Sequence, residues 1–182
     1  MPARQSKLPL LWLLSDERND AVLEAALVAL PPGSGFVFRH YHLDAEQRAA
    51  RFARLSAAAR EVGHCVIVAG DAALAQQWGA DGTYGAARVI AGAPGLRLAT
   101  AHDGDELAAA GRAEANGVFL SPVFATRSHP EAVPLGIHGF HVLAQQSPVP
   151  VIALGGMTKA RAEELAWLRW GAIDGLVSQQ DS

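Results

Sequence analysis

Residues 117–130 read GVFLSPVFATRSHP, and residues 149–157 read VPVIALGGM. Each stretch contains a short apolar run, Val118–Leu120 in the first and Val149–Leu154 in the second, followed by polar, Gly or Pro residues. Apolar runs this short, separated by one helical pattern near 137–146, are typical of parallel strands that are buried on both faces. The sequence therefore predicts a parallel sheet with helices packed against it.

Polar and glycine residues follow both runs. The side chains after the first run are rich in hydrogen-bond donors: Ser121, Thr126, Arg127, Ser128 and His129. The second run is followed by Gly155 and Gly156, and then by Thr158 at the start of a predicted helix. A glycine pair lets a ligand touch bare backbone, and the N–H groups at a helix start attract anions. This pattern indicates a phosphate-ester site at the carboxyl ends of parallel strands.

The rest of the chain repeats the strand–helix pattern. The other predicted strands are Leu10–Leu14, Phe36–Phe38, Cys65–Ala69, a brief run within 79–84, Leu96–Thr100 and 171–178. Eight strands with helices between them predict a (β/α)8 TIM barrel. An open doubly wound sheet is the alternative, but no Gly-x-Gly-x-x-Gly turn follows the first run.

The length of the chain limits this barrel. Such barrels typically need about 250 residues, whereas this chain has 182. We therefore expect one compact domain over 1–182, a loose tail at 1–7, and a missing or reduced eighth helix. The uncovered outer face of the last and first strands would expose apolar surface, which predicts a homodimer.

Helix starts and aromatic residues allow more local predictions. Asn19 is predicted to cap the first helix, and Asp44 with Gln47 resembles a capping box for the second. The four tryptophans, Trp12 among them, are expected at seams between helices and barrel. One of His40 and His42 is expected to face the barrel mouth, because both follow the second strand.

Composition excludes several classes of function. Half of the residues are apolar, the net charge is −3, and no block of Lys and Arg stands out, which argues against a nucleic-acid or membrane-surface partner. Leu10–Leu14 is too short for a membrane span, so we expect a cytoplasmic protein. The single Cys65 lies in an apolar run, which predicts a buried structural thiol.

Several motifs together resemble the thiamine phosphate synthase and TenI (thiazole tautomerase-like) superfamily. They are GADG at 79–82, SPVFATRSH at 121–129, LG at 135–136, VIALGGM at 151–157 and GAIDGLVS at 171–178. The resemblance implies a (β/α)8 barrel. It also implies a synthase that joins hydroxymethylpyrimidine diphosphate to hydroxyethylthiazole phosphate and releases diphosphate with Mg²⁺. The implied partners are thus small phosphorylated heterocycles.

The resemblance also implies roles for individual residues. The phosphate-binding positions match Thr126, Ser128, Gly155, Gly156, Val177 and Ser178. The catalytic positions match Arg39, His102, Ser128 and His129, with His129 in the place of a family lysine. Independently of the resemblance, Arg39 at a barrel rim needs an anionic partner. Asp71 matches a metal-ligating aspartate, although an aspartate there can also cap a helix.

The chain departs from the family pattern in the half of the site that handles diphosphate. The second metal-ligating aspartate is missing, and Gly85–Arg88 stands in its place. We therefore expect Mg²⁺ to be held weakly. The histidine of the tautomerase branch is replaced by Pro122, so a thiazole phosphate isomerase would need His102 or His129 as its base. A binder of thiazole phosphate or thiamine phosphate without catalytic activity is the third alternative.

Overall fold

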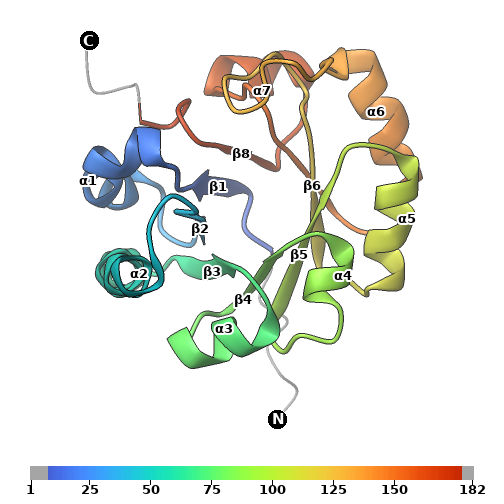
Figure 1. Ribbon diagram of the computed structural model, residues 1–182. Coiled ribbons are helices and arrows are strands. Elements are labelled where there is room, and N and C mark those ends of the chain that lie inside the picture. The colour runs from blue at the N-terminus through green and yellow to red at the C-terminus, as the bar shows by residue number, and fades with distance from the viewer. Residues whose placement is uncertain (1–7, 178–182) are drawn as a thin grey trace.

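Eight short parallel strands pair in chain order, and the eighth pairs back with the first (Figure 1). In the computed structural model, which describes residues 8–177, the closing pairs join Trp12 to Gly171 and Leu13 to Ala172. The strands are β1 (Leu11–Leu14), β2 (Gly35–Phe38), β3 (Cys65–Ala69), β4 (Gly82–Gly85), β5 (Leu96–Ala101), β6 (Gly117–Leu120), β7 (Val151–Ala153) and β8 (Trp170–Ala172). The predicted closed barrel is confirmed, and the open sheet is excluded.

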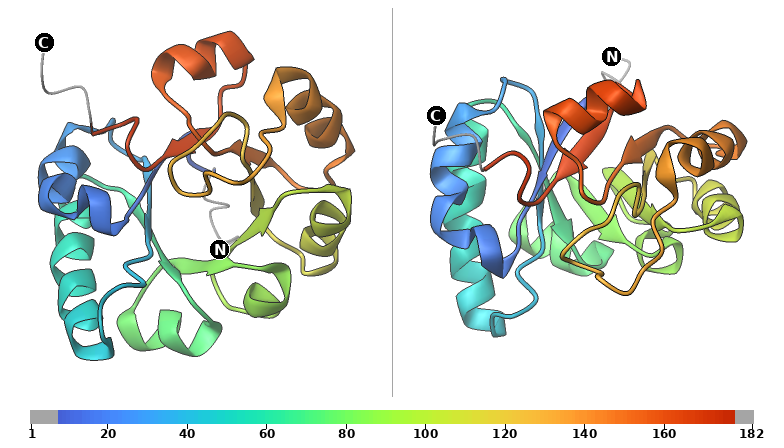
Figure 2. Two further views of the ribbon diagram at one scale, coloured as in Figure 1. Left: turned by 45° about the horizontal axis from the view of Figure 1, so that its top comes forward. Right: turned by 90° about the horizontal axis from the view of Figure 1, so that it is seen from above.

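The helices form a ring outside the strands (Figures 1 and 2). A 3₁₀ helix, η1 (Glu17–Val22), comes first. The α-helices are α1 (Leu23–Ala29), α2 (Ala45–Glu61), α3 (Ala72–Trp78), α4 (Ala87–Ile90), α5 (Gly104–Arg112), α6 (Gly136–Gln146) and α7 (Lys159–Leu165). No helix follows β8 within residues 8–177, because 173–177 form bends and turns. The predicted tail at 1–7 lies outside the described residues. None of the helices in the described part has the length and apolarity to cross a bilayer.

The strands bury both faces, as predicted, because alternate side chains point into the barrel and out toward the helices. In β1, Trp12 and Leu14 join the cluster inside the barrel, whereas Leu13 packs with the helices outside it. The inner cluster also contains Val37, Ile67, Leu98, Phe119 and Ile152. These side chains have no exposed surface, so the barrel interior is a packed core below the carboxyl ends of the strands.

Trp12 fills the amino end of the barrel, and this corrects its predicted place at a helix–barrel seam. Its indole Nε1 donates to the carbonyl oxygen of Pro9 at 2.9 Å. A Cβ added to Gly35 on the neighbouring strand would lie 2.1 Å from the indole ring. Only glycine therefore leaves room for this ring between β1 and β2.

Polar residues after the strands cap the helices that follow. Asp44, Asp71, Asp103 and Thr158 each accept a hydrogen bond from the backbone N–H three residues further on. The predicted cap at Asp44 is thus confirmed, with Gln47 N at 2.8 Å. The predicted cap at Asn19 is wrong. Asp16 caps η1. The buried Asn19 side chain completes the capping box by accepting from the Asp16 N–H at 2.8 Å, and it also donates to the carbonyl oxygens of Leu14 and Ile173.

The eighth strand is shorter and earlier than predicted. It ends at Ala172, where pairing with β1 ends, and the chain then bends through 173–175. A Cβ on Gly175 would lie 2.0 Å from the carbonyl oxygen of Met157, so this bend packs directly against the loop after β7. The loops after β7 and β8 therefore form one continuous rim.

Cys65 behaves as the predicted structural thiol. It is free and half-buried at the start of β3, and burial raises its pKa to about 12. A thiol with this pKa stays protonated near neutral pH and is a poor nucleophile.

Candidate functional site

A cavity of about 680 Å³ lies at the carboxyl ends of the strands. Its wall is formed by residues at the carboxyl ends of β4, β5 and β8 and by residues that follow β2, β4, β5, β6, β7 and β8. This is the face on which barrels of this type carry their sites, and the volume is in the range of small-molecule pockets. The predicted position of the site therefore coincides with this cavity.

Gly155 and Gly156 form the part of the wall contributed by the loop after β7. Both have positive φ angles, +99° and +62°, and an added Cβ would lie 2.6 Å from Pro122 Cα and 2.4 Å from the carbonyl oxygen of Ala125, respectively. Neither amide donates a hydrogen bond to another residue in the described range. Two unengaged N–H groups on a cavity wall are suited to bind the oxygens of a phosphate.

The loop after β6 supplies the hydroxyl and imidazole groups predicted for the site. Thr126, Ser128 and His129 all line the cavity. The backbone N–H of Ser128 donates to Thr126 Oγ1 at 3.3 Å, and Ser128 Oγ accepts from Arg18 Nη2 at 2.8 Å. Arg18 also lies 3.7 Å from Asp174 after β8. The loops after β1, β6 and β8 are thus tied together beside the cavity, and His129 is exposed at its edge.

Arg39 follows β2 and reaches the cavity wall with only 13% of its side chain exposed. Its Nε donates to the carbonyl oxygen of Ser15 at 3.0 Å, and its Nη2 donates to Asp16 Oδ2 at 3.0 Å. These two contacts hold the guanidinium in one place before any ligand binds, which favours binding of an anion.

Tyr84 lies in the same wall and was not among the predicted site residues. Burial raises the pKa of its phenol, although the charge of Arg39 acts in the opposite direction. The phenol therefore remains a hydrogen-bond donor at neutral pH. The signal in the sequence was a large polar aromatic residue near the end of β4, which periodicity alone does not distinguish from a packing residue.

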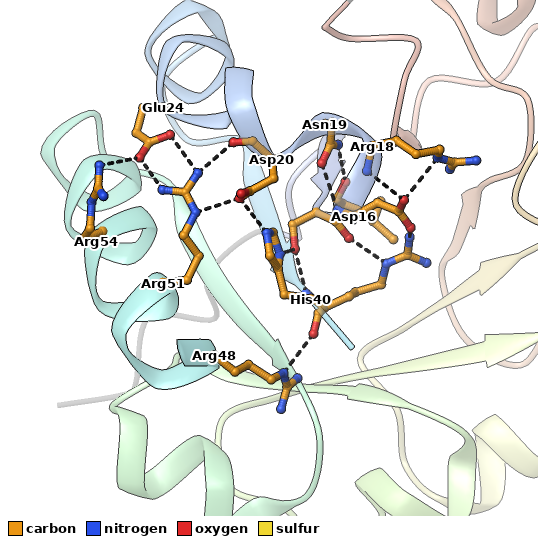
Figure 3. A network of polar contacts seen from close by, with 12 residues as sticks. Asp16, Arg18, Asn19, Asp20, Glu24, His40, Arg48, Arg51 and Arg54 are labelled. Carbon is orange, nitrogen blue, oxygen red and sulfur yellow. Dashed lines mark hydrogen bonds and ion pairs between the residues drawn. The ribbon is translucent and has the colours of Figure 1, made fainter. Parts of the chain in front are cut away.

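Neither His40 nor His42 lines the cavity, contrary to the expectation that one of them would face the mouth. His40 is instead buried in a polar network with Asp20 and Arg51 (Figure 3). Its Nε2 lies 2.7 Å from Asp20 Oδ1, its Nδ1 lies 2.7 Å from Ser15 Oγ, and its ring stacks on Phe38. Ser15 Oγ also accepts the backbone N–H of Arg39 at 2.8 Å. The network therefore fixes the backbone from which Arg39 extends.

The same network makes a pH dependence predictable. Burial lowers the pKa of His40 below 6.5, and the nearby Asp20 opposes this only partly. Burial raises the pKa of Asp20, but hydrogen bonds from His40 and Arg51 outweigh it, so the pKa is lowered from 3.8. Below pH 6.5 the unfolded chain thus binds more protons at His40 than the folded protein, and below pH 3.8 more at Asp20 as well.

We therefore expect the free energy of unfolding to fall as the pH drops from about 6.5, by at most about 1.4 kcal/mol per pH unit from His40. Urea unfolding at pH 7.5, 6.5 and 5.5 measures this slope. His40→Gln should flatten the slope, whereas His138→Gln, which changes an exposed histidine on α6, should keep it. An equal slope in His40→Gln and the unaltered protein would contradict the assignment.

His102 lines the cavity at the end of β5 and is half exposed. Its backbone N–H and its Nδ1 both contact Glu106 Oε2, at 2.7 and 2.8 Å. Its Nε2 makes no hydrogen bond to the described residues. This imidazole is thus anchored on one nitrogen, and the other nitrogen can take part in chemistry.

The structure does not bring every predicted site residue to the cavity. Val177 is absent from the wall among residues 8–177, and its backbone N–H donates to the carbonyl oxygen of Asp174 while its side chain packs with the core outside the barrel. Ser178 lies outside the described residues. The loop after β8 instead contributes Ile173, Asp174 and Gly175 to the wall.

Asp71 also lies away from the cavity wall. It is exposed, and its Oδ1 accepts from Leu74 N at 2.9 Å as the cap of α3. Mg²⁺ prefers an octahedral shell of oxygens with one or two carboxylates. Within 8–177 no group of three or more His, Cys, Asp or Glu side chains is placed to hold a metal. This finding rules out a cluster of that size among residues 8–177 but not a single carboxylate that acts together with substrate phosphates, so the metal role of Asp71 stays a prediction.

The charge of the wall is strongly one-sided. Arg39, Arg127 and Arg161 line the cavity, and Asp174 is the one carboxylate among the described lining residues. Arg161 was not predicted, although a basic residue five positions after the Gly155–Gly156 pair was visible in the sequence. A cationic wall with low-dielectric surroundings attracts anionic ligands.

The fold and the site thus define a (β/α)8 barrel whose cavity, at the carboxyl ends of the strands, favours anions. A family model described as thiamine monophosphate synthase matches residues 11–173. The chain belongs to the thiamine monophosphate synthase family, and the resemblance seen in the sequence is confirmed.

Individual relatives agree with this assignment. A thiamine-phosphate synthase of Xanthomonas campestris pv. campestris is 33% identical over 178 residues, which cover 91% of this chain and 84% of that protein. One of Chloroflexus aurantiacus is 31% identical, over 86% of this chain and 74% of that protein. A thiamine phosphate pyrophosphorylase from Pyrococcus furiosus superimposes with a TM-score of 0.78 at 21% identity, over 97% and 90% of the two chains. That superposition shows a shared fold.

Proposed function

We propose that the chain is a thiamine-phosphate synthase-like transferase of thiamine biosynthesis, which joins hydroxymethylpyrimidine diphosphate to hydroxyethylthiazole phosphate and releases diphosphate. The single observation that carries this proposal is the pair of unengaged amides at Gly155 and Gly156 in a cationic cavity. The relatives named thiamine-phosphate synthase support the same activity.

The chemistry of the transfer fits what the wall can supply. The bond between the pyrimidine methylene carbon and the diphosphate oxygen breaks, and the electron pair leaves with diphosphate. The thiazole nitrogen then donates its lone pair to the methylene carbon and forms the new C–N bond. Because the cation is stabilised by the pyrimidine ring, the protein has to position the two substrates and stabilise the leaving group.

Each part of the wall has a role in this proposal. Gly155 and Gly156 bind the thiazole phosphate through their N–H groups. Arg39 stabilises the negative charge on the departing diphosphate, and Ser128 and His129 donate hydrogen bonds to it. Thr126 Oγ1 orients the loop through its contact with the Ser128 N–H.

The test is an assay of diphosphate release from the purified chain with both substrates. Net release should require both substrates together, because without the thiazole the cation recombines with the diphosphate held beside it. Absence of release with both substrates and added Mg²⁺ would contradict the transferase.

A thiazole phosphate isomerase is a second candidate, favoured by the free Nε2 of the anchored His102. It would exchange a ring proton of thiazole phosphate with solvent, and His102→Ala would abolish the exchange. A binder without catalytic activity would instead bind thiamine phosphate and show neither exchange nor diphosphate release.

We also propose that Mg²⁺ supports the transferase weakly and that Asp71 contributes the one carboxylate. Asp71→Ser separates this role from helix capping, because serine caps helices about as well as aspartate. We expect unchanged thermal stability and a rise of about tenfold in the Mg²⁺ concentration for half-maximal activity. Asp103→Ser, which changes the cap of α5 in the same way, is the control. An unchanged Mg²⁺ requirement in Asp71→Ser would leave Asp71 as a cap alone.

The assembly and the compartment complete the proposal. We propose a homodimer, supported by the absence of a helix after β8 within the described range and by exposed Leu10 and Leu168 near the strand ends. We propose the cytoplasm as the compartment, because the substrates are charged phosphate esters.

A further inference from the structure

Arg161 occupies a position between the two loops that form the phosphate-binding wall. It lies in the first turn of α7, where its own N–H donates to Thr158 Oγ1 at 3.2 Å. Its side chain turns back so that Nη1 donates to the carbonyl oxygen of Gly156. The guanidinium also stacks over the ring of Phe124, 5.1 Å from its centre. Arg161 thus joins the loop after β7 to the loop after β6.

The positive charge of Arg161 has no carboxylate partner in the described part of the chain. The one carboxylate in the described cavity wall, Asp174, lies 3.7 Å from Arg18 instead. An arginine carries five N–H donors, and Arg161 uses a side-chain donor only for Gly156 O in the described structure. A charge of this kind on a cavity wall is suited to bind an anionic ligand.

The guanidinium lies beside Gly156, one of the two residues with unengaged amides. A Cβ added to Gly156 would be 3.0 Å from Arg161 Nη1. A phosphate held by the N–H groups of Gly155 and Gly156 would therefore be within reach of the remaining guanidinium donors, which match phosphate oxygens in pairs. The contact to Gly156 O also offsets the partial negative charge of that carbonyl, which would otherwise repel an anion.

We propose that Arg161 is the charged ligand of the phosphate subsite and sets the preference for a phosphorylated ligand over the corresponding alcohol. The identity of the ligand as a thiazole phosphate rests on the proposed function, whereas the binding of phosphate by Arg161 does not. The N–H groups of Gly155 and Gly156 are neutral donors. Arg161 therefore adds an ionic contact to the phosphate site.

Inorganic phosphate tests the subsite without any assay of activity. Calorimetric titration of the whole chain should show that Arg161→Gln raises the Kd for phosphate about 10–100-fold, the loss expected for a hydrogen bond to a charged group. Lys159→Gln, on the same helix and exposed, removes the same charge outside the cavity wall and should change the Kd less than about twofold. Arg161→Met, which keeps the packing on Phe124 and removes the charge, should match Arg161→Gln.

The enzymatic readout is the selectivity between the thiazole phosphate and the thiazole alcohol. Arg161→Gln should raise the KM for the phosphate ester, leave the KM for the diphosphate substrate unchanged, and remove most of the preference for the ester. If Arg161→Gln or the folded Arg161→Met binds phosphate within twofold of the unaltered protein, the inference is overturned and the transferase stands. If phosphate binding depends on Arg161 but no diphosphate is released from the two substrates, the inference stands and the transferase fails.

Discussion

Arg39→Gln is expected to lower kcat/KM for the diphosphate substrate by about 10²–10³-fold, the loss seen when one preorganised donor to a developing charge is removed. Arg39 lines the cavity wall with only 13% of its side chain exposed. It is already held by Ser15 O and Asp16 before a ligand binds. Its charge therefore acts on the leaving group with little reorganisation. Because the effect arises as charge develops, kcat should fall more than KM rises.

Steady-state kinetics of diphosphate release measure this effect, and two features of the structure keep the result interpretable. Asp16 retains Arg18 Nε at 3.1 Å when Arg39 is lost, so no carboxylate is left without a partner. Arg54→Gln removes an arginine on α2 that is 74% exposed and does not line the cavity, and it should leave the kinetics unchanged. A loss of less than threefold in Arg39→Gln would remove Arg39 from the catalytic machinery.

Gly156→Ala is expected to cost roughly 2–5 kcal/mol of stability and to abolish phosphate binding. The residue has a φ of +62°, which disfavours any side chain. The added Cβ would also lie 2.4 Å from the carbonyl oxygen of Ala125. Since that neighbour is backbone, the loop after β6 has to move. The N–H groups of Gly155 and Gly156 then lose their alignment with the hydroxyl groups of that loop.

Gly33→Ala provides the matched control for conformational strain. Gly33 has a φ of +80°, but an added Cβ would meet nothing within 4 Å. It should therefore lose about 1–2 kcal/mol from the backbone alone and keep its activity. Urea unfolding and phosphate titration of both variants separate the backbone strain of a positive φ from the steric clash of the added Cβ. Equal stability losses in the two variants, with phosphate binding kept in Gly156→Ala, would refute the proposal that the Gly155 and Gly156 N–H groups bind phosphate.

The order of strands and helices could be predicted because the apolar runs are short and several are followed by a polar residue that caps the next helix. Asp44 and Asp103 show this rule at work. The prediction failed where tertiary contacts override local pattern. Asn19 looks like a cap in sequence, yet a longer-range role, binding the carbonyl oxygens of Leu14 and Ile173, determines its position.

The glycine residues and the polar loop residues of the site could be predicted from the sequence. Gly155, Gly156 and the donors of 126–129 come together because parallel strands in a barrel end on one face. The direction of individual side chains was harder to predict. His40 turns outward into a buried network, and Asp71 is used as a cap. Arg161 turns back toward the loop before it, which helical position alone does not reveal.

The indole of Trp12 plugs the barrel opposite the cavity, and the inner side chains above it leave no exposed surface. Within residues 8–177, the cavity is therefore closed toward the amino end of the barrel. Two substrates must enter, and two products must leave, by the same route. A ligand that lies beneath the other cannot leave first, so we expect binding and release of the two ligands to follow a fixed order.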